Sequence, residues 1–118
     1  GHIFFVDDPL DSCCPNQMTQ FINRGIRTFR HNDVGIQFVL HNIRSGIWSS
    51  TASSNCKYVV LFPRSQRGKV RDYLNQEMGC TMKESREHVH DFASTGRAMY
   101  VRLFSPQCLI NKKMIRLL

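Results

Sequence analysis

The stretch His2-Ile3-Phe4-Phe5-Val6-Asp7-Asp8 runs four apolar side chains directly into two adjacent carboxylates. A short apolar run of this kind is typical of a buried β-strand, and open parallel sheets bind their ligands at the carboxyl ends of the strands. Because Mg²⁺ prefers oxygen ligands such as carboxylates, this order predicts a strand that ends at a site for a metal ion and a nucleotide. The alternative is a buried strand that enters a polar turn at Asp7-Asp8-Pro9.

The composition is that of an ordinary globular protein. The chain has 118 residues, of which 42% are hydrophobic and 21% are charged. We therefore expect a single domain over residues 1–118 with a modest core. The longest apolar run, 58–62, is far shorter than the roughly 20 residues that span a bilayer, and no signal peptide is recognisable. We expect a protein of the cytoplasm or nucleus that is neither secreted nor inserted in a membrane.

The charge balance favours a polyanionic partner. The formal net charge is +7 and the isoelectric point is near 9.5, and a concentrated basic surface gains free energy when counterions leave bound phosphates. These charges predict contact with nucleic acid, whereas the alternative is that they only keep the chain soluble. The basic residues gather in three clusters: Arg24, Arg27 and Arg30; Arg64, Arg67, Lys69 and Arg71; Lys112, Lys113 and Arg116.

The cysteines predict reduced thiols. There are five of them, an odd number, and none forms a C-x-x-C pair. Reduced thiols fit a cytosolic or nuclear compartment. Neither Cys13-Cys14 nor His88 with His90 has the ligand spacing of a closed zinc site, so we expect no zinc.

The order of expected elements indicates an α/β fold. After the opening strand the patterns predict helices over 15–29, 65–78 and 81–93, and strands over 34–40, 57–62, 98–104 and 114–118, with a short helix or turn near Trp48. Thr81-x-x-Glu84 has the order of a capping box, and Gly79 and Gly96 are suited to end helices. Strands that alternate with helix-sized segments imply a mainly parallel sheet flanked by helices.

Polar residues follow three of the expected strands. They are Asp7-Asp8, His41-Asn42 and Pro63-Arg64, and in a parallel sheet they would share one edge. Adjacent side chains leave a strand end in opposite senses, so Asp7 is predicted to hold Mg²⁺ and Asp8 to orient a nucleophilic water. Asn42 is suited to contact a γ-phosphate or that water, and the other interpretation of His41-Asn42 is a turn or cap. A two-metal nuclease would need further acids here, and the remaining acids show no motif for it.

A phosphate-binding loop of the form G-x-x-x-x-G-K-[ST] is absent from these residues. The nearest string, 63–70, contains Gly68-Lys69. It has Pro63 where the motif has its first glycine, and Val70 where the motif has the serine or threonine whose hydroxyl binds Mg²⁺. The basic side chains in and beside this string therefore suit a nucleic-acid backbone or a neighbouring subunit. They are Arg64, Arg67, Lys69 and Arg71.

The joint pattern resembles the second half of a viral or Polinton-type genome-packaging ATPase of the HerA/FtsK P-loop superfamily. The resemblance covers residues 2 to about 80 and, more loosely, 100–118. The matching motifs are the apolar run with two acids (Walker B), Phe29-Arg30-His31, the strand ending at His41-Asn42, Asn55-Cys56-Lys57-Tyr58 and Phe62-Pro63-Arg64-Ser65.

The resemblance implies a role for several residues. Asp7 and Asp8 would serve Mg²⁺ and ATP hydrolysis, and Arg30 would act as an arginine finger on a neighbouring subunit, although an arginine at a helix end also complements the helix dipole. Where the family has Gln or Gln-Asn as a sensor, this chain has His41-Asn42, and either could take that role; the amide of Asn42 both donates and accepts. The implied partners are double-stranded DNA, copies of the same chain in a ring, and viral capsid proteins.

Residues 1–118 lack the Walker A half that holds ATP. We therefore expect the chain alone not to hydrolyse ATP and to be a part of a DNA-packaging or DNA-translocating motor. The alternatives are a non-enzymatic, basic nucleic-acid-binding module and an inactive fragment of the same fold.

Overall fold

The computed structural model of the chain describes residues 2–7, 15–39 and 55–118. The chain divides into two compact units, Gly1–Cys56 and Lys57–Leu118. Both contain helices and strands, so the α/β class expected from the sequence is confirmed. The expectation of a single domain stays a prediction.

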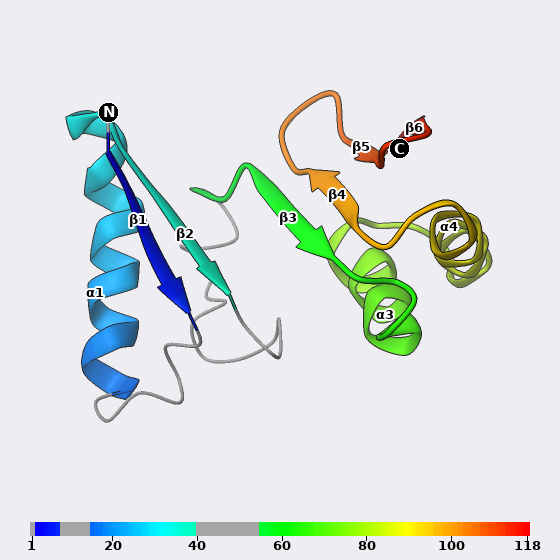
Figure 1. The fold of residues 1–118 in the computed structure, drawn as a ribbon, viewed down its shortest axis with the longest axis horizontal. Coiled ribbons are helices and arrows are strands. Elements are labelled where there is room, and N and C mark those ends of the chain that lie inside the picture. The colour runs from blue at the N-terminus through cyan, green and yellow to red at the C-terminus, as the bar shows by residue number, and fades with distance from the viewer. Residues whose placement is uncertain (1, 8–14, 40–54) are drawn as a thin grey trace. The chain divides into compact units, whose positions relative to one another are not determined.

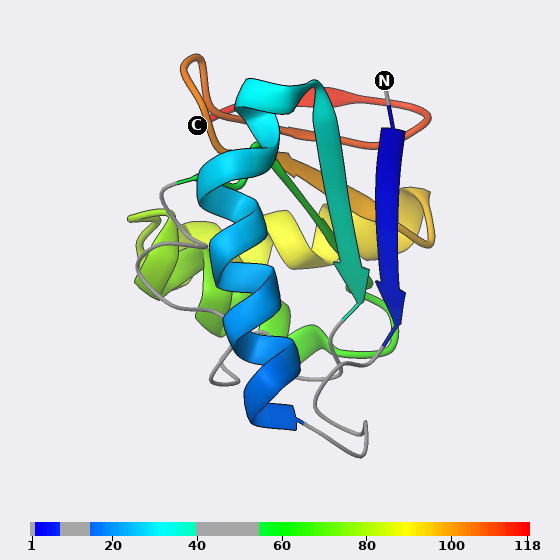
Figure 2. The same ribbon diagram turned by 90° about the vertical axis from the view of Figure 1, so that its left-hand side faces the viewer.

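The first unit is a strand-helix-strand crossover. Its elements are β1 (His2–Asp7), α1 (Pro15–Thr28), the short 3-10 helix η2 (Phe29–Asn32) and β2 (Val34–Val39). The two strands pair in parallel, from His2 opposite Val34 to Asp7 opposite Val39. Figure 2 shows β1 and β2 side by side with α1 along them. The predicted strand, helix and parallel pairing are confirmed here, since one helix between two strands returns the chain to its starting edge. The expectation that the first strand is buried is wrong, because Ile3 and Phe5 are 77% and 62% exposed.

The apolar residues of α1 follow helical spacing, and Ile22 among them is fully buried. Gly25 lies on the same helix, and a Cβ there would come within 2.7 Å of the Phe29 ring one turn later. The glycine therefore makes room for an aromatic ring that meets Phe21 edge to face, with 6.0 Å between ring centroids. Asp33 follows η2 in the left-handed region, at φ 53°.

The second unit is a four-stranded antiparallel sheet with two helices. Its elements are β3 (Tyr58–Leu61), α3 (Arg67–Glu77), α4 (Met82–Thr95), β4 (Met99–Arg102), β5 (Cys108–Ile110) and β6 (Ile115–Leu117). The strands lie in the order β3-β4-β5-β6, and each neighbouring pair is antiparallel. Figure 1 shows α3 and α4 on one side of this sheet.

The expectation of a mainly parallel sheet is wrong for these strands. Two helices, α3 and α4, separate β3 from β4. A single crossover helix would return the chain for a parallel strand, whereas a pair of helices returns it for an antiparallel one. The next connections, 103–107 and 111–114, are shorter than the dozen or so residues that a parallel crossover needs. The sequence patterns also missed β5 as a separate strand.

The core of the second unit lies between the sheet and the two helices. The buried side chains of the sheet alternate along β3 and β4 with exposed ones, so only one face of the sheet meets α3 and α4. The fully or nearly buried apolar residues are Val59, Met99, Val101 and Leu109 from the strands, and Val70, Tyr73, Leu74, Val89, Phe92 and Ala93 from the helices.

The helix ends in this unit are the ones that the sequence predicted. Thr81 Oγ1 accepts a hydrogen bond from the Glu84 N–H at 3.1 Å, and Glu84 Oε2 accepts one from the Thr81 N–H at 2.8 Å, which completes the capping box. Gly79 follows α3 at φ 72°, a left-handed conformation that glycine adopts without strain. The Gly96 N–H donates to the Phe92 carbonyl at 3.1 Å at the end of α4.

In the three described segments no helix is both long enough and apolar enough to cross a lipid bilayer.

Candidate functional site

The parallel pair β1–β2 ends at one edge. Asp7 is the last residue of β1 and lies opposite Val39, the last residue of β2. The structure therefore brings the end of the Walker B-like run to the edge that the sequence predicted for it. Asp8, His41 and Asn42, which were predicted at the same edge, lie outside the described residues. Pro63 and Arg64 were predicted there too, and this is wrong, because they follow β3, which belongs to the other sheet.

Arg30 belongs to η2, which leads into the opposite end of β2. The first residue of β2, Val34, pairs with His2 at the start of β1. Six-residue strands separate the two edges by about 16 Å, so the backbone of Arg30 lies far from that of Asp7. An arginine in this position is not suited to serve the acids of its own chain, whereas the role in trans needs no such proximity and stays a prediction.

A metal site was predicted at the strand ends. Over 2–7, 15–39 and 55–118, no three His, Cys, Asp or Glu residues lie close enough together to hold a metal ion. Of the predicted acids only Asp7 falls in these segments, so the Mg²⁺ site and the bound ATP stay predictions.

The basic segment 64–71 divides into residues that the fold uses and residues that it leaves exposed. Arg64 Nε donates to the Ala93 carbonyl oxygen at 2.7 Å, and Arg71 pairs with Asp72 at 3.1 Å. Arg67 and Lys69 lie in the first turn of α3, both exposed, and neither forms a hydrogen bond or ion pair within the described part of the chain. These two are the members of the cluster best placed to meet an anionic partner.

The net charge of the chain belongs entirely to its second unit. Residues 57–118 carry 12 Lys and Arg against 5 Asp and Glu, a net charge of +7, whereas residues 1–56 carry four of each. All five acids of the second unit lie in α3 and α4. The strands of its sheet and the segments outside the two helices therefore carry basic residues without any acid.

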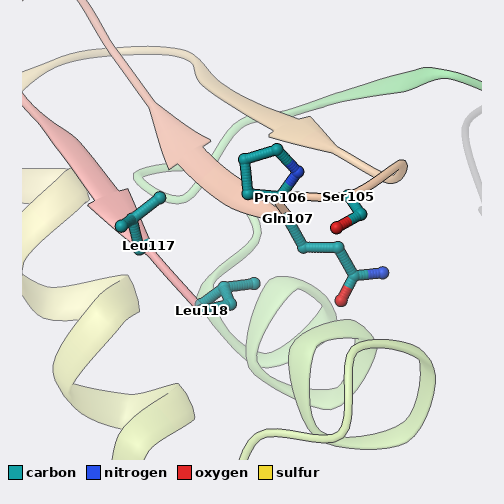
Figure 3. A pocket seen from close by; sticks show the side chains of 5 residues that line it. All are labelled: Ser105, Pro106, Gln107, Leu117 and Leu118. Atoms are coloured by element: carbon teal, nitrogen blue, oxygen red, sulfur yellow. The ribbon is translucent and has the colours of Figure 1, made fainter.

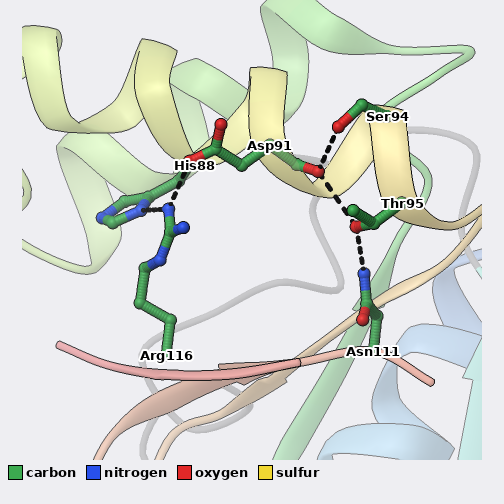
Figure 4. Close-up of polar contacts among 6 residues, drawn as sticks. All are labelled: His88, Asp91, Ser94, Thr95, Asn111 and Arg116. Atoms are coloured by element: carbon green, nitrogen blue, oxygen red, sulfur yellow. Dashed lines mark hydrogen bonds and ion pairs between the residues drawn. The ribbon is translucent and has the colours of Figure 1, made fainter. Parts of the chain in front are cut away.

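A polar network holds the β5–β6 hairpin against α4 (Figure 4). Arg116 Nη1 lies 2.8 Å from Asp91 Oδ2 and donates to His88 Nδ1 at 3.1 Å. Burial lowers the pKa of His88, and the Arg116 cation lowers it further. Arg116, which the sequence grouped with Lys112 and Lys113, is thus occupied within the fold.

The same network continues through the hairpin turn. Thr95 Oγ1 donates to the Asp91 carbonyl at 2.9 Å and accepts from Asn111 Nδ2 at 2.7 Å. The side-chain oxygen of Asn111 in turn accepts the N–H groups of Lys113 and Met114. Every member is engaged in fastening the hairpin, so we assign this network to stability and not to chemistry.

A shallow hollow of about 410 Å³ lies beside the loop between β4 and β5 (Figure 3). The hollow is lined by Ser105, Pro106, Gln107, Leu117 and Leu118. None of these residues has a titratable side chain, so the hollow has no group for acid-base or nucleophilic chemistry.

Sequence reasoning missed a group of aromatic side chains on the second sheet. Tyr58, Tyr100 and Phe104 are 50%, 47% and 40% exposed. The signal was present as alternation, in Tyr58-x-Val60 and in Tyr100-x-Arg102-x-Phe104. A parallel sheet is covered on both faces, whereas in this antiparallel sheet α3 and α4 lie on one face only.

Comparisons of the chain with protein-family models, with curated proteins and with solved structures found no match.

Proposed function

We propose that the chain is the C-terminal portion of an ATP-dependent DNA translocase of the HerA/FtsK type, of the kind used in genome packaging. The β1-α1-β2 crossover carries this proposal, because its parallel strands end at one edge and Asp7 is the last residue of β1. We infer that this crossover is a part of a P-loop core. The proposed partners are double-stranded DNA, identical subunits in a ring, and viral capsid proteins.

In this proposal the acids and the arginine act in different subunits. Asp7 holds Mg²⁺, Asp8 orients the attacking water, and Asn42 or His41 contacts the γ-phosphate of ATP. When bound, Mg²⁺ neutralises charge on the β- and γ-phosphates. Arg30 acts on the ATP of the neighbouring subunit, and the distance of about 16 Å along the strands between its edge and that of Asp7 supports an action in trans.

The test is ATP hydrolysis by the longer protein that contains the upstream half of the core. The chain alone is expected to be inactive, because it lacks G-x-x-x-x-G-K-[ST]. In the longer protein Asp8→Asn and Arg30→Ala should each abolish hydrolysis. Mixed rings of the two variants should regain part of the activity, because some interfaces then pair an intact Asp8 with an intact Arg30. A longer protein without the motif, or hydrolysis that survives Asp8→Asn, overturns the proposal.

The second candidate is a nucleic-acid-binding module that does not use ATP. The observation that favours it is the segregation of charge, with the whole net charge of +7 in residues 57–118 and with Arg67 and Lys69 exposed on α3. Phosphate contacts predict duplex binding that falls steeply between about 50 and 200 mM salt.

A double variant tests this module. Arg67→Gln with Lys69→Gln should weaken binding of duplex DNA and reduce its salt dependence by about two phosphate contacts. Arg71→Gln is the matched control, because Arg71 is paired with Asp72. Duplex binding that does not depend on nucleotide favours the module, and binding or assembly that requires ATP favours the motor.

A further inference from the structure

One face of the β3–β6 sheet is turned away from α3 and α4. In antiparallel pairs, residues directly opposite share a face, so Tyr58 lies beside Arg102, and Val60 beside Tyr100. Through Cys108 and Ile110 of β5, the same rows continue to Leu117 and Ile115 on β6. We call this surface the open face. Cys108 is buried within it, at 4% exposed. The other residues of the open face are Tyr58, Val60, Tyr100, Arg102, Ile110, Ile115 and Leu117, together with Phe104, which follows β4.

The aromatic side chains of the open face are arranged as a platform. Tyr58 meets Phe104 edge to face, with 5.6 Å between ring centroids. The Arg102 guanidinium lies 4.0 Å from the centroid of the Phe104 ring. Tyr100 is the diagonal neighbour of Tyr58, and such neighbours lie about 7–8 Å apart. The rings of Tyr58 and Tyr100, each about half exposed, therefore lie side by side on this face.

Basic residues flank the platform at both ends. Lys57 precedes Tyr58, and its carbonyl accepts the Leu103 N–H at 2.9 Å, which places it at the end of the sheet that carries Arg102. Lys112 and Lys113 form the turn between β5 and β6 at the other end, and both are exposed. No acid occurs in residues 57–118 outside α3 and α4.

We propose that the open face binds single-stranded nucleic acid, with bases stacked on Tyr58 and Tyr100 and phosphates near the flanking lysines. This inference rests on the nucleic-acid-binding candidate above and extends it to a second surface and a different strand state. Aromatic rings beside a basic groove are the combination that holds unpaired strands, since every base has a face that can stack. In a duplex those faces are covered by neighbouring base pairs, so the rings select the unpaired strand.

The charge on this face decides between nucleic acid and other occupants. A second copy of the chain would bring the same basic, acid-free surface against itself, and the like charges of Lys57, Lys112 and Lys113 would oppose that pairing. A polyanion instead gains from all of them. The exposed apolar side chains Val60, Ile115 and Leu117 add surface that a stacked base also covers.

The experiment measures the Kd of the full chain for a labelled oligothymidylate and for a duplex of the same length. Tyr100→Leu keeps an apolar side chain but removes the ring, and should weaken single-strand binding about 5- to 100-fold, the equivalent of one lost stack. Tyr100→Phe keeps the ring and should leave the Kd unchanged. Tyr58→Leu and Tyr58→Phe repeat the comparison at a second site on the platform.

The outcomes separate this inference from the duplex-binding proposal. Loss of single-strand affinity in the Leu variants alone, with duplex affinity intact, supports stacking on the open face. Equal affinities for the Leu and Phe variants overturn it, as does self-association of the chain through this face in sedimentation. Duplex binding through Arg67 and Lys69, together with a single-strand affinity that no ring variant changes, overturns the stacking inference alone. Absence of binding to both probes overturns the two together.

Discussion

Arg64 donates a hydrogen bond from Nε to the carbonyl oxygen of Ala93, at 2.7 Å. Ala93 lies in the last turn of α4, where carbonyl groups have no partner within the helix. Arg64 therefore ties the turn after β3 to the end of a helix 29 residues away in sequence. The sequence placed Arg64 among the nucleic-acid contacts, but this bond gives it a structural role.

The first prediction follows from this bond. Arg64→Ala should lower the free energy of unfolding by about 1–2 kcal/mol, the range for a hydrogen bond with one charged partner at a partly exposed site. Arg67→Ala is the control and should change it by less than about 0.5 kcal/mol, because Arg67 is exposed and unpaired among the described residues. Urea denaturation of the full chain measures both, and equal losses would argue against a structural Arg64.

The second prediction concerns the start of α4. Thr81→Ala should cost about 1 kcal/mol, because the Glu84 N–H loses its acceptor at the helix end. Thr81→Ser keeps the hydroxyl oxygen and should retain nearly all of the stability. The two variants are compared by thermal unfolding at neutral pH, and a Ser variant as unstable as the Ala variant would contradict the assigned hydrogen bond.

The features that the sequence predicted correctly are local ones. The capping box at Thr81, the glycine after α3 and the helical spacing around Ile22 each depend on residues within a few positions of one another. The parallel pairing of β1 with β2 was also predictable, because one helix joins them. The direction of β4 was not, since it depends on how α3 and α4 fold back on each other.

The same limit applies to the candidate site. In sequence, Arg64, Arg67 and Arg116 are equivalent members of basic clusters. Only the folded chain separates Arg67, which has no hydrogen bond or ion pair among the described residues, from Arg64 and Arg116, which are engaged with α4. The aromatic open face escaped prediction for a related reason, because alternation in Tyr100-x-Arg102 has functional meaning only once one face of the sheet is known to be turned away from α3 and α4.

The third prediction is a dependence of stability on pH through His88. Burial and the Arg116 cation hold the pKa of His88 below its ordinary value, so the unfolded chain binds the proton more readily than the folded one. Stability should therefore fall as the pH decreases below about 6.5, the ordinary histidine value, and should level off below the folded pKa. The free energy of unfolding between about pH 7.5 and 5 measures this slope.

Two comparisons assign that slope to His88. His88→Gln should remove it, whereas His90→Gln should not, because His90 is exposed on the same helix and has none of these contacts in the described segments. Hydrogen bonds with Thr81 lower the pKa of Glu84. The stability that the Glu84 carboxylate contributes is therefore lost only below the ordinary glutamate pKa of about 4.3, outside the pH range of the histidine slope. A slope that persists in His88→Gln would show that another group is responsible.

The fourth prediction concerns Ser85, whose side chain is fully buried on α4 while its Oγ has no hydrogen-bond partner among the described residues. A buried hydroxyl without a partner costs about 1–3 kcal/mol, and serine is also a weaker helix former than alanine. Ser85→Ala should therefore raise the free energy of unfolding by about 1 kcal/mol, contrary to the loss usual for core substitutions. Ser94→Ala, which removes an exposed hydroxyl bonded to the Asp91 carbonyl at 2.8 Å, serves as the comparison in urea denaturation and should give no comparable gain. A loss of stability in Ser85→Ala would mean that the hydroxyl has a partner, such as a buried water, whose contribution exceeds the cost of burial.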